Sequence, residues 1–328
     1  MGKKKGFLTT EFYLAVFLAA ILLFMAVAAR EFYSINNLMS LLNSFSYILI
    51  SAIGMNLIIL TSNIDVSAGA LISVVCLSIA ALGKQGIPFA GLMAAAMVIG
   101  AVLSTLNGLF ITRLKIPAIV ATLATTQIFQ GVLPLTVDGS IYDLPASFTW
   151  LAFDAKIFGI VPASVLICLI VTVAALLFVK YSRFARKLYA IGNNSNGARL
   201  SGIRVDRTVV WTYTIAGALF GISAVIIATA GQRVTTTMGS GLEMTFIAAV
   251  VLGGTNTAGG SGKILGTVIG AFILAMIAPA INYLGISPDW SDAVKGAIIL
   301  ISVVVGAAKY IKKKRVIDDP AARERSAA

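Results

Sequence analysis

The sequence predicts an all-α polytopic membrane protein with about ten transmembrane helices, some of them broken or re-entrant. Hydrophobic residues make up 59% of its 328 residues and charged residues 12%, and the mean hydropathy is +0.96. Soluble domains are about half apolar, and so few charges cannot cover a surface that faces water. Apolar runs able to cross a bilayer also recur along the whole chain. Together these observations exclude an ordinary soluble domain.

Ten apolar runs approach the length of a transmembrane helix, which needs about 20 mostly apolar residues. They predict spans at 12–29, 45–62, 67–83, 88–110, 117–136, 157–180, 208–229, 243–258, 264–284 and 292–309. The segment 30–43 mixes polar and apolar residues and is expected to lie along the outer membrane surface. The lysines before the first run resemble a signal peptide. The run itself exceeds the roughly 7–15 residues of a signal core, so it is expected to be retained.

The distribution of charge agrees with ten spans. The net charge is +12, and the basic segments 111–116, 181–207 and 309–315 fall on the same side as the N-terminal lysines. The positive-inside rule makes that side the cytoplasm and places both termini there. We expect one transmembrane domain over residues 1–315 and a disordered cytoplasmic tail over 316–328. The basic residues suit lipid headgroups, and nucleic acid is not expected as a partner.

Residues that support catalysis or metal binding are scarce. The sequence contains no histidine, which removes the usual metal ligand, the usual proton shuttle and any Ser-His-Asp arrangement. Gly262-Lys263 is followed by Ile264, and a threonine stands five places before Gly262, so no phosphate-binding loop is present. Cys76 and Cys168 lie inside apolar runs and are expected to be packing residues. The chain is therefore predicted to be no enzyme and to bind no metal or cofactor.

Residues 181–207 form a long hydrophilic segment in the interior of the sequence, strongly basic with Asp206 as its one acid. A short helix is predicted inside it. Asn194 or Ser195 can cap that helix, and Gly202 can end it. A topology anchor would need only positive charge, so a capped helix indicates a docking surface for a partner. The candidate docking residues are Asn194, Gly197, Ala198, Arg199, Leu200 and Gly202.

Two polar breaks, at 61–69 and 253–263, interrupt the apolar pattern at membrane depth. Non-helical backbone is tolerated there only against protein or a watery cavity, so each break predicts a permeation pathway or gate, with a tight turn as the alternative. Amide and hydroxyl groups suit a small neutral hydroxylated solute. The candidate pathway residues are Asn56, Asn63, Asp65, Ser67, Thr122, Thr126, Gln127, Gln130, Gly253, Gly254 and Thr255. For each side chain an interhelical hydrogen bond is the alternative. Asp65 is expected to cap a helix rather than carry a proton.

Four segments of the sequence resemble permease subunits of bacterial ATP-binding-cassette (ABC) importers. The similar branch serves ribose, xylose, rhamnose and autoinducer-2, and the similarity runs from about Asn36 to Ala307. It implies an ABC importer permease fold in the bacterial inner membrane and uptake of a ribose-type monosaccharide or autoinducer-2. The segments are LTSNIDVSAGA (60–70), RLKIPAIVATLATT (113–126), IGNNSNGARLSGIRVDR (191–207) and GSGLEMTFIAAVVLGGTNTAGGSGKILGTVIGA (239–271).

The resemblance also implies partners. A second permease copy or a paralogue would complete a pore, and a periplasmic solute-binding protein would deliver the solute. An ATP-binding subunit, which can be a tandem cassette, would hold ATP and Mg²⁺ and receive residues 197–202 in a cleft. Arg199 is expected to pair with an acid on that subunit. The alternatives are a stand-alone secondary transporter, a membrane-embedded enzyme and a structural subunit of a heterodimer.

Overall fold

The fold is seen in a computed structural model, which describes residues 10–300 except 138, 154, 158–160, 232 and 299. The expected tail 316–328 and most of the expected span 292–309 lie outside the described residues. The elements are α1 (Thr10–Ala28), η1 (Arg30–Tyr33), α2 (Ile35–Leu60), α3 (Ala68–Lys84), α4 (Phe89–Arg113), α5 (Ala118–Thr136), β1 (Ser140–Ile141), α6 (Ala146–Phe153), β2 (Lys156–Ile157), β3 (Val161–Pro162), α7 (Ala163–Tyr181), α8 (Arg183–Asn193), α9 (Ser195–Leu200), α10 (Val205–Thr229), β4 (Val234–Thr235), α11 (Leu242–Leu252) and α12 (Ile264–Tyr283).

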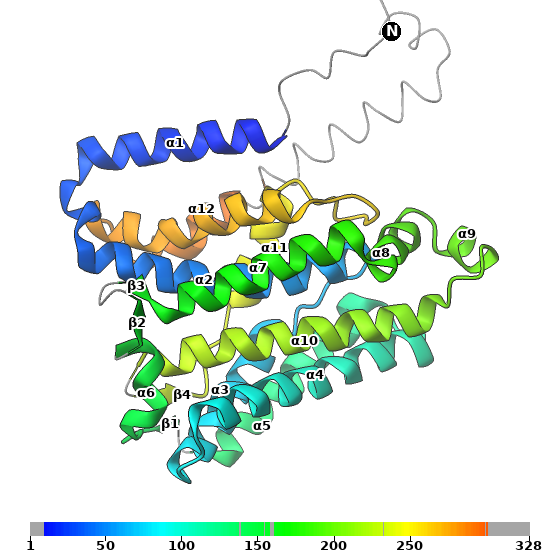
Figure 1. The fold of residues 1–328 in the computed structure, drawn as a ribbon, viewed down its shortest axis with the longest axis horizontal. Coiled ribbons are helices and arrows are strands. Elements are labelled where there is room, and N and C mark those ends of the chain that lie inside the picture. Colours follow the sequence, from blue (N-terminus) through cyan, green and yellow to red (C-terminus); the bar gives the residue numbers. More distant parts are fainter. Residues whose placement is uncertain are drawn as a thin grey trace, which may run out of the picture.

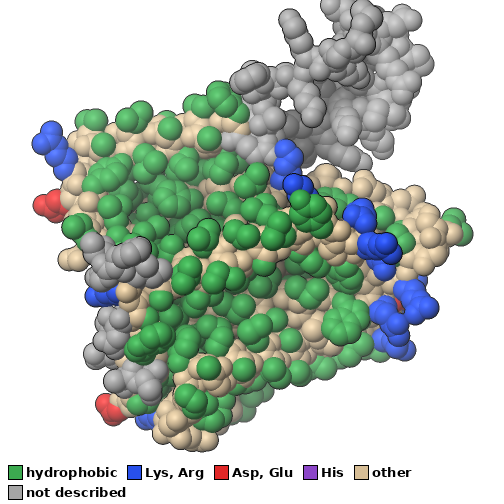
Figure 2. Space-filling model, in the orientation of Figure 1, with side chains coloured by type: hydrophobic (Ala, Val, Ile, Leu, Met, Phe, Trp, Pro, Cys, Tyr) green, Lys and Arg blue, Asp and Glu red, His purple; other side chains and the backbone are tan. Residues whose placement is uncertain are grey.

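The long helices lie side by side with roughly parallel axes (Figure 1). Among the described residues, six helices are long and apolar enough to cross a membrane, namely α2, α4, α5, α7, α10 and α12. The apolar parts of α1, α3 and α11 are shorter. Hydrophobic side chains cover the flanks of the helices, and lysine and arginine side chains gather mainly at the ends (Figure 2). The predicted all-α polytopic membrane protein is therefore confirmed.

The core is built around α2 and α10. The second half of α2, from Ile48 to Leu60, is almost completely buried, and α4 packs along α10 through small residues. Gly100 on α4 faces the backbone of Gly217 on α10, so closely that a side chain at either position would collide with the other helix. Without water to drive association, such close backbone approach is what holds membrane helices together. The outer faces of α4 and α7 are largely exposed, as expected for helices that face lipid.

Three predicted boundaries were wrong. Residues 35–43 continue α2 instead of lying on the membrane surface, because the Asn37 amide is satisfied by the Phe32 carbonyl at 2.6 Å and Leu41 packs inward. The expected span 243–258 ends at Leu252, and α11 has only 11 residues. Ile157 lies in β2 and Val161–Pro162 form β3, which pairs antiparallel with β2, so α7 begins only after Pro162.

The two ends of the bundle carry different structures. Helices α8 and α9 lie at one end, whereas α6 and both β pairs lie at the other (Figure 1). The β1–β4 pair joins segments that are far apart in sequence, with Ser140 opposite Thr235. The basic segment 181–207 and the loop that follows α5 are therefore at opposite ends, as the distribution of charge predicts.

Candidate functional site

Helix α9 forms where the sequence predicts a capped helix. The Asn194 side chain accepts a hydrogen bond from the Gly197 N–H at 2.9 Å, so Asn194 is the N-cap. Gly202 has a φ of 81°, a conformation that glycine adopts without strain. The N–H of Gly202 bonds to the Arg199 carbonyl, and that of Ile203 bonds to the Ala198 carbonyl, each at 3.0 Å. This is a Schellman ending, so local contacts close both ends of the helix.

The docking residues predicted from the sequence all lie on α9 or at its ends. Ala198 is buried against the bundle, whereas Leu200 is 92% exposed. Helix α9 projects beyond the ends of the long helices (Figure 1). A capped helix that projects from the bundle is in a position to present its exposed side chains to another protein.

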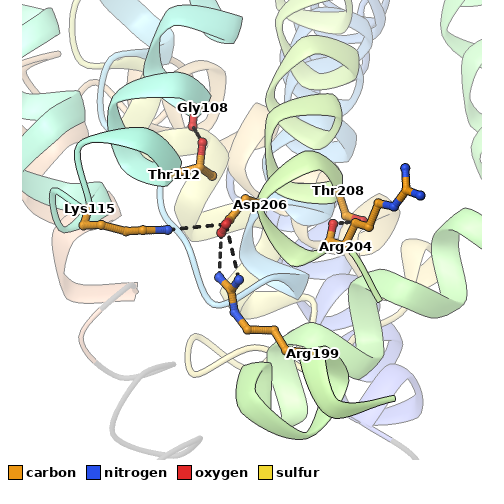
Figure 3. Close-up of polar contacts among 7 residues, drawn as sticks. All are labelled: Gly108, Thr112, Lys115, Arg199, Arg204, Asp206 and Thr208. Carbon is orange, nitrogen blue, oxygen red and sulfur yellow. Dashed lines mark hydrogen bonds and ion pairs between the residues drawn. The ribbon is translucent and has the colours of Figure 1, made fainter. Parts of the chain in front are cut away.

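Asp206, in the first turn of α10, binds α9 to the rest of the bundle (Figure 3). The Arg199 guanidinium donates to both carboxylate oxygens of Asp206, at 2.6 and 3.3 Å. Lys115, from the α4–α5 connection, lies 3.4 Å from the same carboxylate. Hydrogen bonding to Asp206 raises the pKa of Arg199. Arg199 therefore has an acidic partner on this chain, and its pairing with an acid on another subunit stays a prediction.

The C-terminal end of α8 contacts both polar breaks, an arrangement that the sequence analysis missed. The Ser62 hydroxyl lies 2.7 Å from the Ala258 carbonyl and 3.2 Å from the Gly192 carbonyl. The Gly260 N–H donates to the Leu60 carbonyl at 3.1 Å. These bonds join the end of α2, the end of α8 and the glycine-rich segment at one place, which we call the three-way junction.

Two further side chains of α8 complete the three-way junction. The Asn193 amide donates to the Gly260 carbonyl at 2.9 Å, and the Tyr189 hydroxyl donates to the Gly262 carbonyl at 3.0 Å. Gly192 leaves no room for a side chain, since a Cβ there would overlap the Leu60 carbonyl oxygen and the Gly260 backbone. The sequence signal for this junction is only a glycine near the end of a basic amphipathic helix. That signal is too weak to predict which segments of the chain the helix contacts.

The first break is organised by Asp65, which is fully buried. Its Oδ1 accepts from the Ser67 N–H at 2.9 Å and from the Ser67 hydroxyl at 2.6 Å. The Asn107 amide of α4 donates to the Ser67 oxygen at 2.7 Å. Thr122 of α5 accepts from the Val66 N–H at 3.2 Å. Ser67 is the residue directly before α3 and makes no cap hydrogen bond with its own side chain. The Asp65 carboxylate instead accepts the Ser67 N–H at the start of this helix, as expected of a capping residue.

The second break is tied to α2 and α12 by Asn56. Its amide donates to the Thr255 hydroxyl at 2.8 Å and to the Thr267 hydroxyl at 2.7 Å, and all three side chains are buried. Gly253 lies directly against Gly266 of α12. Thr267 was not predicted, and its place among the small residues at the start of α12 was the only available signal. At Asn56 the structure has the interhelical hydrogen bond that the sequence analysis kept as an alternative.

Comparison with known proteins identifies the family. The chain matches the family described as "Branched-chain amino acid transport system / permease component" over residues 37–303. It belongs to that permease family. It is 36% identical over 296 residues to the ribose import permease protein RbsC of Escherichia coli K12, covering 88% of this chain and 92% of that protein. It is 33% identical over 277 residues to the autoinducer 2 import system permease protein LsrC of Yersinia pestis Pestoides F, covering 84% and 78%. No solved structure matches.

The remaining candidate pathway residues of this permease do not join either buried cluster. Gln127 and Gln130 lie on the exposed face of α5. Thr126 donates to the carbonyl of Thr122 in its own helix at 2.7 Å. Among the described residues, Asn63 bonds to Thr61, two positions before it. The last candidate, Gly254, has a φ of 85° and turns the chain after α11.

Proposed function

We propose that the chain is the transmembrane permease subunit of a bacterial ABC importer for a small neutral hydroxylated solute. The solute class is a ribose-type monosaccharide or autoinducer-2, and ATP hydrolysis on a partner subunit drives uptake. The observation that carries this proposal is similarity along most of the chain to a ribose import permease and to an autoinducer 2 import permease. In this proposal the permease itself makes or breaks no covalent bond.

The proposed assembly has three kinds of partner. They are a second permease copy or paralogue, an ATP-binding subunit with one or two cassettes that holds ATP and Mg²⁺, and a periplasmic solute-binding protein. This chain spans the inner membrane many times, with both termini in the cytoplasm. The exposed Leu200 on a capped helix supports docking of the ATP-binding subunit at residues 197–202. The binding protein would meet the opposite end, where α6 and the β pairs lie.

Coupling requires that the partners bind two states of the permease unequally. In the proposed mechanism the ATP-binding subunit moves α9. Arg199 and Asp206 transmit that movement to α10, and Lys115 transmits it to the α4–α5 connection. Tyr189 and Asn193 of α8 transmit it to the glycine-rich break. One cytoplasmic movement therefore reaches two places at membrane depth.

We assign different roles to the candidate pathway residues. Gln127 and Gln130 are accessible on α5, and each amide can donate to and accept from a sugar hydroxyl. We propose that these two contact the solute. Asn56, Asp65 and Ser67 are buried within the chain, so their proposed role is to hold the breaks in position. In this assignment solute specificity depends on α5.

One observation favours a second candidate, the stand-alone secondary transporter. Asp65 is a buried carboxyl group whose Oδ2 has no hydrogen-bond partner among the described residues. Ionisable groups at membrane depth often mark ion-coupled transport. Asp65 would then be the site that binds a proton or cation together with the solute.

Reconstitution distinguishes the two candidates. The permease is purified alone and with the ATP-binding subunit encoded beside it, and each preparation is placed in liposomes with the neighbouring solute-binding protein outside. Labelled ribose and autoinducer-2 are offered with and without ATP. Uptake that needs both ATP and the second subunit supports the importer. Uptake by the permease alone under a proton or sodium gradient supports the secondary transporter and rejects the importer.

A further inference from the structure

A groove of about 1010 Å³ lies between the C-terminal end of α4 and the N-terminal end of α10. Its mouth is at the end of the bundle that carries α9, close to the ion pairs drawn in Figure 3. The groove is separate from both polar breaks. The proposed transport mechanism uses the ion pairs at its mouth but not its interior. Its lining changes from charged at the mouth to apolar and hydroxyl-bearing inside.

The mouth of the groove carries excess positive charge. Arg113, Lys115, Arg199, Arg204 and Arg207 line the groove, with Asp206 as the only acid in that lining. Asp206 is already bound by Lys115 and Arg199. In the part of the chain that the structure describes, no carboxylate pairs with Arg113 or Arg207, and both side chains are exposed. The mouth therefore suits an anionic group.

The groove extends from the charged mouth to membrane depth. Thr105 precedes Arg113 by eight residues of α4, which at about 1.5 Å per residue is about 12 Å along the helix. Its hydroxyl lies 2.6 Å from the hydroxyl of Thr214 on α10, and this pair closes the inner end. Leu109 and Trp211 form part of the wall. A soluble protein docked on the cytoplasmic surface would not reach this depth.

An exposed apolar stripe on α4 leads out of the groove. Val98, Val102, Leu106 and Leu109 follow one another at helical spacing and are 36–61% exposed. Trp211, on α10, is 54% exposed beside them. Tryptophan is enriched where membrane and water meet, and basic pockets between helices on the cytoplasmic side suit anionic headgroups. One molecule that fits both the cations and the stripe has an anionic head and an acyl chain.

We propose that the groove binds one anionic phospholipid. Its phosphate lies at Arg113 and Arg207, and an acyl chain runs past Leu109 along the stripe on α4. Guanidinium groups form charge-assisted hydrogen bonds with phosphate oxygens, while the stripe supplies the apolar contact that a free phosphate ion lacks. Because the groove joins α4 to the first turn of α10, bound lipid would stabilise the region that holds Asp206 and α9.

Native mass spectrometry of the purified full-length chain tests the proposal with phosphatidylglycerol and phosphatidylcholine as probes. We expect one phosphatidylglycerol per chain to be retained in preference to phosphatidylcholine. The double variant Arg113→Gln/Arg207→Gln should weaken retention about tenfold. The matched control Arg183→Gln/Lys187→Gln removes two exposed cations from α8, outside the groove, and should change retention little. Equal losses in the two variants would mean diffuse surface attraction and would overturn the proposal, as would displacement by inorganic phosphate alone.

A second measurement leaves the cations of the groove unchanged. The substitutions Trp150→Phe and Trp290→Phe leave Trp211 as the only tryptophan, since the sequence has three. Phosphatidylglycerol with brominated acyl chains should quench its fluorescence at a lower mole fraction than brominated phosphatidylcholine. Equal quenching by both lipids would mean that the groove does not prefer an anionic headgroup, and would overturn the proposal. No quenching by either lipid would mean that another chain, such as a second permease copy, covers the groove.

Discussion

The hydroxyl of Ser62 lies 2.7 Å from the backbone carbonyl of Ala258, which joins the first polar break to the second across 196 positions of sequence. Ser62 also reaches the carbonyl of Gly192 at the end of α8. The breaks are therefore not two independent turns. Hydrogen bonds join them to each other and to the helix that leads into the proposed docking surface.

Replacement of Ser62 by glycine tests this link. Ser62 has a φ of 62°, and glycine adopts that conformation readily, so Ser62→Gly removes the hydroxyl without straining the backbone. We expect solute uptake per ATP hydrolysed to fall several-fold while ATP hydrolysis continues. The measurement is uptake and phosphate release in the same proteoliposomes. Ser78→Ala is the control, because the Ser78 hydroxyl donates to the Val74 carbonyl of its own helix. An unchanged coupling ratio in Ser62→Gly would contradict the role of the three-way junction.

Close packing at Gly192 gives a second prediction. Gly192→Ala would force a methyl group against the Leu60 carbonyl and the backbone of Gly260. Overpacking of this kind costs about 1–3 kcal/mol, so the thermal midpoint in detergent should fall by several degrees. Gly131→Ala on α5 is the matched control, since a Cβ there has open space. The idea of a tight junction fails if both variants unfold at the same temperature.

The ion pair between Arg199 and Asp206 gives a third prediction. Reversal of charge at Arg199 alone, in Arg199→Asp, should abolish ATP-driven uptake while membrane insertion stays intact. The exchange Arg199→Asp/Asp206→Arg should restore part of the uptake, because the two charges again attract. Lys187→Asp controls for the loss of a cation nearby. No rescue by the exchange would mean that Arg199 acts through another subunit, as the sequence alone had suggested.

How well the sequence predicted each feature depended on how far apart along the chain the interacting residues lie. The caps of α9 are within a few residues of the helix, so Asn194 and Gly202 could be read directly. Apolar runs likewise predicted most of the helices. By contrast, Asn56 and Thr267 are 211 positions apart, and no local pattern connects them. Asp206 is only seven residues from Arg199, yet their pairing depends on the sharp turn at Gly202, which directs α10 back toward α9.

Asn56 gives a fourth prediction, on stability. Asn56→Ala would leave the buried hydroxyls of Thr255 and Thr267 without their shared donor. A buried polar group without a partner costs about 1–3 kcal/mol, so the thermal midpoint should fall. The triple variant Asn56→Ala/Thr255→Val/Thr267→Val removes all three polar groups and should recover part of that loss. A midpoint for Asn56→Ala equal to that of the unmodified chain would mean that the three side chains do not bond as the structure shows.

The exposed glutamines of α5 give the fifth prediction, on solute contact. Gln127→Ala and Gln130→Ala remove groups that have no hydrogen-bond partner among the described residues, so stability should stay the same within about 0.5 kcal/mol. If both amides bind solute hydroxyls, each substitution should lower the affinity about two- to tenfold, since a hydrogen bond of this kind contributes about 0.5–1.5 kcal/mol. The measurement is the KM for labelled solute in ATP-driven uptake. Thr136→Val, at the end of the same helix, is the control, because its hydroxyl bonds to the Leu133 carbonyl. An unchanged KM in both glutamine variants would contradict solute contact at these two residues. It would favour a solute path at the buried breaks.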